Sequence, residues 1–544
     1  MRFQRSLVAA AACAAATFLP AAASAFNASA GSPAAPSTTE LAASAAPHDA
    51  GIAWRQAASD ADVDAAFAAA KAANKPVFVY WGAKWCPPCN QVKATLFNRQ
   101  DFIERSKAFV PVYVDGDSPG AQKIGARFKV SGYPTMVLFN PQGAELTRLP
   151  GEVEPERYTQ VLTLGMNAQR PVKDVLAQAK AGGKGLTPND WRLLAFYSWD
   201  TDEQQLVPKD GTGAVLKQLA AACPADLADV QTRLHLKALA EADGKGKPDA
   251  AGKAVLLKVL ADPAAARAQA DVLTNTSAEL TRATTAKGAR ADVAAAYDAA
   301  LQRLAADTTL SRADRSSALI ARVDLARVDV AKPAKGAPPV KVALPASLIA
   351  DIRARVAADD KEITNGYERQ AVITSDAYLL TDAGLDGESD ALLKANLAKS
   401  HSPYYLMLAL ASNAKQRGDK TEALHWAEEA YAKSEGPATR LQWGAGYVGA
   451  LVEMAPTDDA RIEQAASQVL AEAAKMPDAF YERSGHSLQR IGKRLLDWNK
   501  GGAHSATVKR LETQLDGVCK RLPAGDPQRA TCEGVFKPAA KQSA

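Results

Sequence analysis

Two cysteines, Cys86 and Cys89, are separated by two prolines in "PVFVYWGAKWCPPCNQVKATLF", residues 76–97. Thiols at this spacing could form half of a metal site, a structural cross-link, or a pair that is reversibly oxidised. A structural zinc ion needs four ligands, but the sequence has no second CxxC and its six histidines are scattered. A permanent disulfide over so short a loop would remove little chain entropy. The pattern therefore favours a redox-active pair that needs neither a metal nor a cofactor.

The flanking residues predict how the two thiols differ. The apolar run at 76–81 indicates a buried strand, and the residues after it indicate a helix that starts at Cys86. The amide groups and dipole at a helix N-terminus stabilise a thiolate, and Lys84 would add positive potential. Prolines are well tolerated in a first helical turn. We therefore expect Cys86 to be the exposed nucleophile and Cys89 to be the resolving thiol.

The elements that must position this pair follow a βα pattern over residues 51–168. We expect strands at 76–81, 109–115, 135–140 and 144–149, and helices after a capping box at 59–62 and at 86–97, 120–128 and 154–166. This order of elements predicts an α/β domain with helices on both sides of a mixed central sheet.

The rest of the chain reads as all-α. Alanine and leucine dominate residues 169–330 and 346–518, and the Pro-rich linker 331–345 separates these two helical regions. In the segment 405–437 the spacing of small residues resembles a tetratricopeptide repeat. We predict a degenerate α-solenoid, with an irregular helical bundle as the alternative.

The chain begins with the features of a secretory signal peptide. Residues 1–25 carry two arginines, an apolar run and a small-residue cleavage site, and residues 26–50 form an Ala/Ser/Pro-rich tether. No later apolar stretch reaches the length of about 18 residues that a membrane-spanning helix needs. We expect a protein that is secreted across the inner membrane into the periplasm, without stable membrane insertion. The net charge of +5 is spread over 544 residues, which argues against nucleic-acid binding.

The remaining cysteines suggest structural roles. Cys519 and Cys532 flank a Pro/Gly-containing loop in the C-terminal tail, 519–544, where a structural disulfide is plausible in an oxidising compartment. Cys223 is predicted to be a small buried side chain without a catalytic role.

Two motifs, "WCPPC" and the later "VSGYPT" at 130–135, resemble those of the thioredoxin superfamily. The run around them is most similar to thioredoxin-like domains of secreted thiol:disulfide interchange proteins, over about residues 55–165. The resemblance implies that Trp85 shields the active site and that Pro134 is cis. It also implies that the backbone of Tyr133 pairs with a substrate segment.

One feature departs from that family. Tyr80 stands where thioredoxins carry a buried aspartate, and Pro111 stands where a lysine often accompanies it. Losing both charges together avoids an unpaired buried ion. The direction of electron flow is left open by this change.

These observations support an exported oxidoreductase that acts on protein thiols and disulfides and exchanges electrons with a redox partner protein. The helical repeats would bind partners. The alternative is a non-catalytic adaptor in which the helical region does the main work. The sequence does not determine the oligomeric state.

Overall fold

The computed structural model describes residues 51–130, 132–149, 154–168, 170–202, 205–208, 211–330, 340 and 342–537. The predicted signal peptide and tether lie outside these residues, as does most of the predicted Pro-rich linker.

A five-stranded mixed sheet forms the core of the N-terminal domain, as predicted. The strands are β1 (Arg55–Gln56), β2 (Val77–Gly82), β3 (Val110–Asp115), β4 (Thr135–Phe139) and β5 (Glu145–Leu149). Their order is β1-β3-β2-β4-β5. Strand β2 runs parallel to β3 and antiparallel to β4. The two-residue strand β1 was not predicted, because it is too short for a hydrophobic pattern.

The central strand β2 is buried on both faces. Phe78 and Tyr80 point into one hydrophobic core, while Val79 and Trp81 point into another. A strand covered on both sides needs apolar residues at every position, which explains the continuous run in the sequence. Helices α2 (Asp60–Ala73) and α5 (Ala121–Phe128) cover one face, and α3 (Pro87–Thr95), α4 (Gln100–Ser106) and α6 (Pro155–Met166) cover the other.

All elements after α6 in the described residues are helical. The first group is α7 (Val172–Lys180), α8 (Pro188–Phe196), η1 (Trp199–Thr201), α9 (Thr212–Ala222), α10 (Ala228–Ala242), α11 (Ala250–Ala261), α12 (Pro263–Ala268), α13 (Ala270–Asn275), α14 (Ser277–Thr284), α15 (Ala291–Ala306) and α16 (Arg312–Ala326). The second group is α17 (Ala346–Glu362), α18 (Gly366–Asp382), α19 (Asp386–Asn396), η2 (Leu397–Lys399), α20 (Pro403–Gln416), α21 (Lys420–Lys433), α22 (Pro437–Met454), α23 (Asp459–Ala473), α24 (Glu482–Trp498), α25 (Ser505–Cys519) and α26 (Pro527–Gly534).

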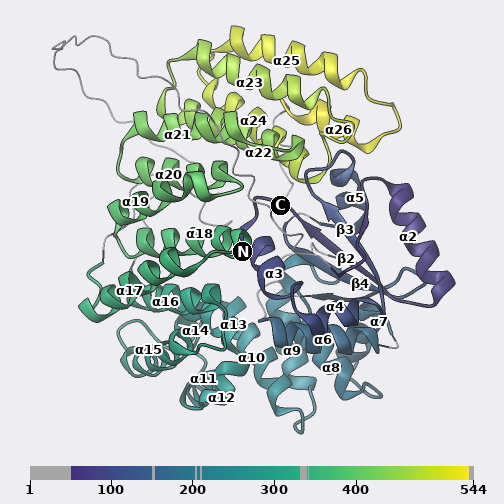
Figure 1. Cartoon of the computed structure of the whole chain (residues 1–544), viewed down its shortest axis with the longest axis vertical. Helices are drawn as coiled ribbons and strands as arrows, with labels where there is room; N and C mark the ends of the chain where they lie inside the picture. Colours follow the sequence, from purple (N-terminus) through teal and green to yellow (C-terminus); the bar gives the residue numbers. More distant parts are fainter. Residues whose placement is uncertain are drawn as a thin grey trace.

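The helices follow one another around the N-terminal domain as a curved arc (Figure 1). The arc starts below the sheet, passes the side on which α3 lies, and ends above the sheet. It returns to the N-terminal domain, because α18 packs against α3 and α24 packs against α5. The arc therefore surrounds the end of the domain that carries the two cysteines.

The helix pair α20 and α21 shows why the arc is compatible with repeat packing. Ala423, Ala427 and Ala430 are buried on α21, and small residues there let two antiparallel helices approach closely. Gly418 takes φ = 82° in the turn between the helices, a left-handed conformation that favours glycine. Pro437 occupies the first turn of α22. The tetratricopeptide assignment itself stays a prediction.

The C-terminal cysteines are joined. A disulfide links Cys519, at the end of α25, to Cys532 in α26. The predicted loop between them contains the start of α26, which begins at Pro527.

Replacing both Cys519 and Cys532 by alanine is expected to lower the free energy of unfolding by about 3 kcal/mol, because the open chain gains entropy in the unfolded state. Urea denaturation of the oxidised protein and of the double variant measures this difference. Equal midpoints would show that the cross-link contributes nothing to stability.

A buried carboxyl group gives the helical region a pH dependence. Asp376 on α18 is fully buried and accepts a hydrogen bond from Ser316, at 2.8 Å. Burial, together with the charge of Asp359, raises the pKa of Asp376 to about 8. The folded state therefore holds a proton that the unfolded state releases near pH 4, so stability falls as the pH rises towards 8.

Asp376→Asn is expected to remove this dependence, because asparagine stays neutral at every pH. Between pH 5 and pH 8 the wild type should lose about 1.4 kcal/mol per pH unit relative to the variant. Urea denaturation of both proteins at several pH values measures the slopes. Parallel slopes would mean that Asp376 is ionised in the folded protein.

Candidate active site

The two cysteines lie where β2 is followed by α3. Cys86 is the N-cap residue of α3, and its sulfur accepts a hydrogen bond from the backbone N–H of Cys89, at 3.2 Å. The sulfurs of Cys86 and Cys89 are joined in a disulfide. Pro87 and Pro88 fill the first turn of α3, where their missing N–H groups cost nothing.

A buried asparagine holds the backbone of the turn. The Nδ2 atom of Asn90 donates hydrogen bonds to the carbonyl oxygens of Lys84 and Cys86, at 2.9 and 2.8 Å. Sequence reasoning missed Asn90, although its position one residue after the second cysteine was a usable signal. It is a positioning residue, because it connects α3 to the segment that precedes Cys86.

The loop before β4 faces the cysteines. The peptide bond between Tyr133 and Pro134 is cis. The hydroxyl of Tyr133 accepts a hydrogen bond from Nε2 of Gln122, at 3.1 Å, and burial raises its pKa. Both Tyr133 and Pro134 line the same cavity as Cys86.

The cysteine pair is buried, contrary to the sequence-based expectation of an exposed nucleophile. Cys86 is 2% exposed, Cys89 is 0% exposed and Trp85 is 6% exposed. The sequence pattern describes the N-terminal domain by itself, and in such a domain this end of the sheet would face solvent. Here the helical arc covers it.

Aromatic residues from the arc enclose Trp85. Tyr405 of α20 stacks on its ring with centroids 5.6 Å apart and an interplanar angle of 16°. Trp443 of α22 makes an edge contact at 4.9 Å. The guanidinium group of Arg483 on α24 lies 5.2 Å from the Trp85 centroid and 5.0 Å from that of Tyr133. Trp85 is thus held in an aromatic and cationic enclosure.

The carboxylate of Asp117 joins the two parts of the chain. It accepts hydrogen bonds from Nε1 of Trp85 at 3.2 Å, from Thr439 and from Arg483. The contacts to the backbone N–H and hydroxyl of Thr439 measure 2.8 and 2.7 Å, and the ion pair with Arg483 measures 3.0 Å. Asp117 and Arg483 side chains are each 10% exposed, so little water screens this pair.

A second set of contacts strengthens the same interface. The backbone N–H of Gln122 donates to Asp478 at 2.9 Å, and the side-chain oxygen of Gln122 accepts from the backbone N–H of Arg483 at 3.1 Å. These bonds tie the start of α5 to the start of α24. Burial raises the pKa of Asp478.

Lys84 points towards the helical arc. Its ammonium group forms an exposed ion pair with Glu435, at 2.9 Å. Burial, followed by the positive charges of Lys84 and Lys93, lowers the pKa of His401 to about 4. The predicted effect of Lys84 on the Cys86 thiolate stays a prediction.

Tyr80 and Pro111 lie in apolar and aromatic packing. Tyr80 is buried and stacks on Tyr113 of β3 at 5.3 Å, with Phe97 at 4.9 Å on another side. Pro111 pairs with Phe78 across the β2–β3 ladder. The ammonium group of Lys93 lies over the Tyr113 ring, 5.4 Å from its centroid.

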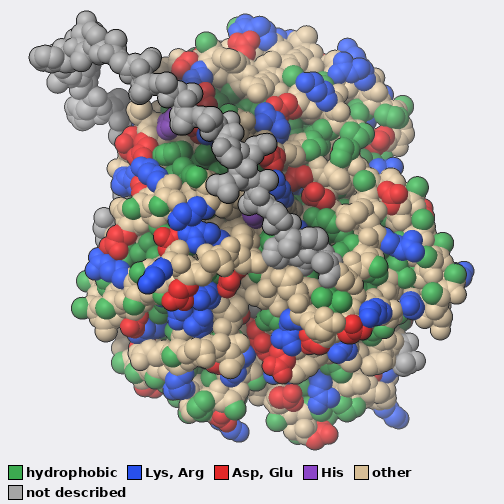
Figure 2. All heavy atoms as spheres, viewed as in Figure 1, with side chains coloured by type: hydrophobic (Ala, Val, Ile, Leu, Met, Phe, Trp, Pro, Cys, Tyr) green, Lys and Arg blue, Asp and Glu red, His purple; other side chains and the backbone are tan. Residues whose placement is uncertain are grey.

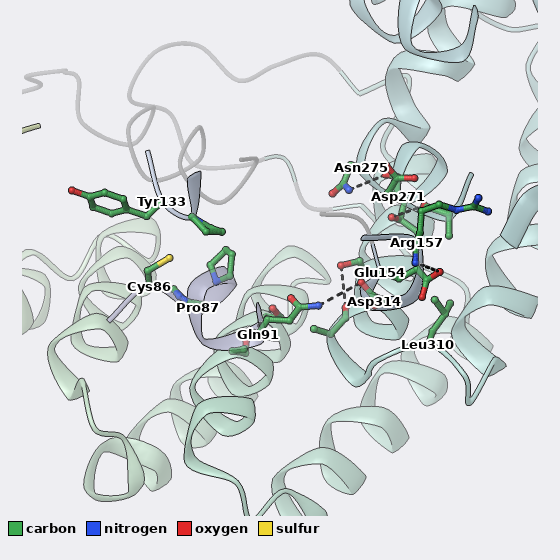
Figure 3. Close-up of a pocket in the computed structure, with 18 of the residues that line it drawn as sticks. Cys86, Pro87, Gln91, Tyr133, Glu154, Arg157, Asp271, Asn275, Leu310 and Asp314 are labelled. Atoms are coloured by element: carbon green, nitrogen blue, oxygen red, sulfur yellow. Dashed lines mark hydrogen bonds between the residues drawn. The ribbon is translucent and has the colours of Figure 1, made fainter. Parts of the chain in front are cut away.

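A cavity of about 180 Å³ separates the cysteines from the first helical region. Figure 3 shows Cys86, Pro87 and Tyr133 on one side, and Glu154, Asn275 and Asp314 on the other. Gln91 of α3 lies between the two sides and donates a hydrogen bond to the hydroxyl of Ser311, at 3.2 Å. Burial, with a smaller contribution from the charge of Glu154, raises the pKa of Asp314 to about 6.

Some contributors to this site had a sequence signal and others had none. Asp117 follows β3, whose carboxyl end must lie beside that of the parallel strand β2, so its proximity to the cysteines was predictable. Arg483 is 366 positions from Asp117, and no local pattern marks it. Tyr405 and Trp443 lie far from Trp85 in the sequence, and no local pattern pairs them with it. Both are buried against Trp85.

The described residues contain no group of three or more His, Cys, Asp and Glu side chains arranged to hold a metal ion. None of the helices in the described ranges combines the length and the apolar character that crossing a membrane requires. Cys223 is the free cysteine of this part of the chain; it is buried, and burial raises its pKa to about 11. On the face shown in Figure 2, basic and acidic side chains are interspersed.

A family model described as a thioredoxin-like domain matches residues 63–165, which include both cysteines and Pro134. Residues 63–165 form a thioredoxin-like domain. A large all-helical region follows it.

Curated relatives match the same part of the chain. It is 29% identical over 105 residues to the thiol:disulfide interchange protein DsbD 1 of Pseudomonas aeruginosa, and 28% identical over 106 residues to DsbD of Pseudomonas fluorescens. Each match covers 19% of this chain and 18% of the relative. The chain therefore spans less than a fifth of the length of these relatives. The solution structure of a thioredoxin from Thermus thermophilus matches at 27% identity, over 21% of this chain and 90% of that one, with a TM-score of 0.18.

Proposed function

We propose that this protein is an exported thiol:disulfide oxidoreductase that acts on protein thiols and disulfides through Cys86 and Cys89. The observation that carries the proposal is the disulfide at the N-terminus of α3, beside the loop that holds Pro134. Its relatives named thiol:disulfide interchange proteins agree with this chemistry. Export and a periplasmic location are proposed from residues 1–25, which lie outside the described residues.

The chemistry would proceed by two exchange steps. In the reduced protein, the Cys86 thiolate attacks a substrate disulfide, a bond forms between Cys86 and one substrate sulfur, and the other sulfur leaves as a thiolate that takes up a proton. Cys89 then loses its proton and attacks the sulfur of Cys86. The second substrate thiolate is released, and two electrons have passed from the protein to the substrate. The reverse sequence oxidises a substrate dithiol.

The roles of neighbouring residues follow from their positions. The helix N-terminus and Lys84 would stabilise the Cys86 thiolate once the disulfide opens. Trp85 would limit the access of water, and the backbone beside Pro134 would pair with the substrate. A partner protein with a dithiol would return the two electrons in the cell.

One observation favours the adaptor alternative. Tyr405, Trp443 and Arg483 occupy the face around Trp85, as expected if the domain mainly holds the helical arc in place. An adaptor, however, needs neither thiol of the pair. The two functions therefore differ in whether the protein turns over a disulfide.

The test is the reduction of a self-quenched fluorescent peptide dimer, joined by one disulfide, in the presence of dithiothreitol. The protein is expected to accelerate peptide release about 10²-fold or more over dithiothreitol alone, as expected for covalent catalysis by a thiolate. Alkylation of thiols during the reaction should show the pair cycling between its two states. A protein that does not change the rate would be an adaptor.

A further inference from the structure

The face that a folded substrate would use is already occupied. In the thioredoxin-like domain, Cys86, Trp85 and the Pro134 loop lie at one end of the sheet, and a docked protein must contact that end. Tyr405, Trp443 and the rest of the α20–α24 segment cover it, leaving Cys86 2% exposed. A folded partner and the helical arc cannot both occupy this space.

The cavity offers a narrow approach from another direction. It extends from Cys86 and Pro134 past Gln91 to the wall formed by α6, α13 and α16 (Figure 3). Its volume of about 180 Å³ is close to that of engineered cavities of roughly 150 Å³ that hold one benzene molecule. A cysteine side chain with its adjacent backbone fits such a space, whereas a folded surface does not.

The far wall of the cavity carries polar groups suited to a peptide backbone. Asn275 and Asp314 face the cavity, and the amide of Gln91 reaches from α3 towards Asp314. Asp314 accepts a hydrogen bond from Ser311 at 2.7 Å, so its carboxylate is held in place. The carboxylate and amide oxygens can accept from N–H groups. Nδ2 of Asn275 already donates to the carbonyl oxygen of Asp271, at 2.8 Å, and has one further hydrogen for a peptide carbonyl. Nε2 of Gln91 is engaged by Ser311 and Asp314.

We propose that the helical arc makes this protein selective for disulfides carried on slender, unfolded peptide groups, which reach Cys86 through the cavity between α3 and α16. The proposal rests on the function proposed above and names its substrate class. The chemical group that the cavity would recognise is a cysteine disulfide with peptide amides beside it. Its source is either an extended polypeptide segment or a small peptide disulfide such as oxidised glutathione.

A linker series tests the proposal on the full-length wild-type protein. The same fluorescent peptide disulfide is joined to a folded, cysteine-free carrier domain through a Gly/Ser linker of about 2 or about 20 residues. The longer linker has a root-mean-square span of about 25 Å, so the disulfide can enter while the carrier stays outside. The shorter one extends at most about 7 Å, so the carrier must collide with the arc.

We expect exchange to be about tenfold slower with the short linker, after division by the rates with dithiothreitol alone. Equal corrected rates for the two linkers, with both substrates accelerated over dithiothreitol alone, would overturn the proposal while leaving the proposed function intact. If the protein accelerates neither linker substrate nor oxidised glutathione, both the proposal and the function fail. Turnover of glutathione disulfide without the long-linker substrate assigns the cavity to small peptide disulfides; turnover of the long-linker substrate assigns it to extended segments.

A variant tests whether the cavity is the route. Ser317 on α16 lines the cavity away from the cysteines, and Ser317→Phe should fill it. The control is Thr513→Phe on α25, at an exposed position that is not part of the cavity lining. We expect Ser317→Phe to slow exchange with the long-linker substrate about tenfold at an unchanged circular dichroism spectrum, and the control to match wild type. A folded Ser317→Phe protein with wild-type rates would exclude this route.

Discussion

Replacing Cys86 by serine is expected to reduce disulfide exchange about 10³-fold or more, because the attacking thiolate is lost and no covalent intermediate forms. Cys89→Ser should behave differently. The first attack still occurs, but no second thiol releases the substrate from Cys86. Cys89→Ser protein should therefore accumulate mixed disulfides that Cys86→Ser protein does not form.

Non-reducing electrophoresis and mass spectrometry after incubation with the disulfide-linked peptide measure these products. The matched control is Cys223→Ala, which removes the free cysteine of the described residues from a different hydrophobic core. It is expected to exchange at the wild-type rate. If Cys86→Ser protein accumulated the mixed disulfide, through Cys89, and Cys89→Ser protein did not, the assignment of nucleophile and resolving thiol would be reversed.

Asp117→Ala is expected to lower the free energy of unfolding by about 3–5 kcal/mol, because it leaves the buried Arg483 cation without its carboxylate partner. The same substitution removes the acceptor of the Trp85 indole N–H and of Thr439. These bonds connect the cysteine-bearing end of the domain to α22 and α24. The covering of Cys86 should therefore loosen as well.

Urea denaturation measures the stability change, and the rate at which dithiothreitol reduces the Cys86–Cys89 disulfide measures accessibility. The control is Asp64→Ala, which breaks an ion pair with Arg127 that is 2.8 Å long but exposed. Exposed pairs contribute at most about 1 kcal/mol, so the control should change neither quantity much. If Asp117→Ala matched the control in both, Asp117 would not hold the interface together.

Local patterns in the sequence predicted the thioredoxin-like domain closely. The run at 76–81 is apolar at every position because β2 is buried on both faces, and that requirement is visible without any tertiary information. The helix that contains Cys89 begins at Pro87, as proline in a first turn indicates. Strand β1 was not predicted, because two residues are too few to show the alternation of apolar and polar side chains that marks a strand.

The sequence predicted that the region after the thioredoxin-like domain is all-α, but it did not predict how the helices are arranged around that domain. Alanine- and leucine-rich segments indicate helices, because each buries an apolar stripe, yet the stripe does not say which surface will cover it. Trp443 has the same local signature whether it contacts a neighbouring helix or Trp85. Its partner depends on the path of the whole arc.

The sequence by itself determined the dithiol and its place at a helix start, because these depend on short spacings along the chain. The place of the Tyr133–Pro134 loop beside the dithiol was implied by the resemblance to thioredoxins. Only the tertiary structure decided that the dithiol is enclosed. Arg483 meets Asp117 across 366 positions, and such a contact follows from the summed packing of many helices rather than from any local pattern. The physical reason is that burial of a surface depends on what folds over it.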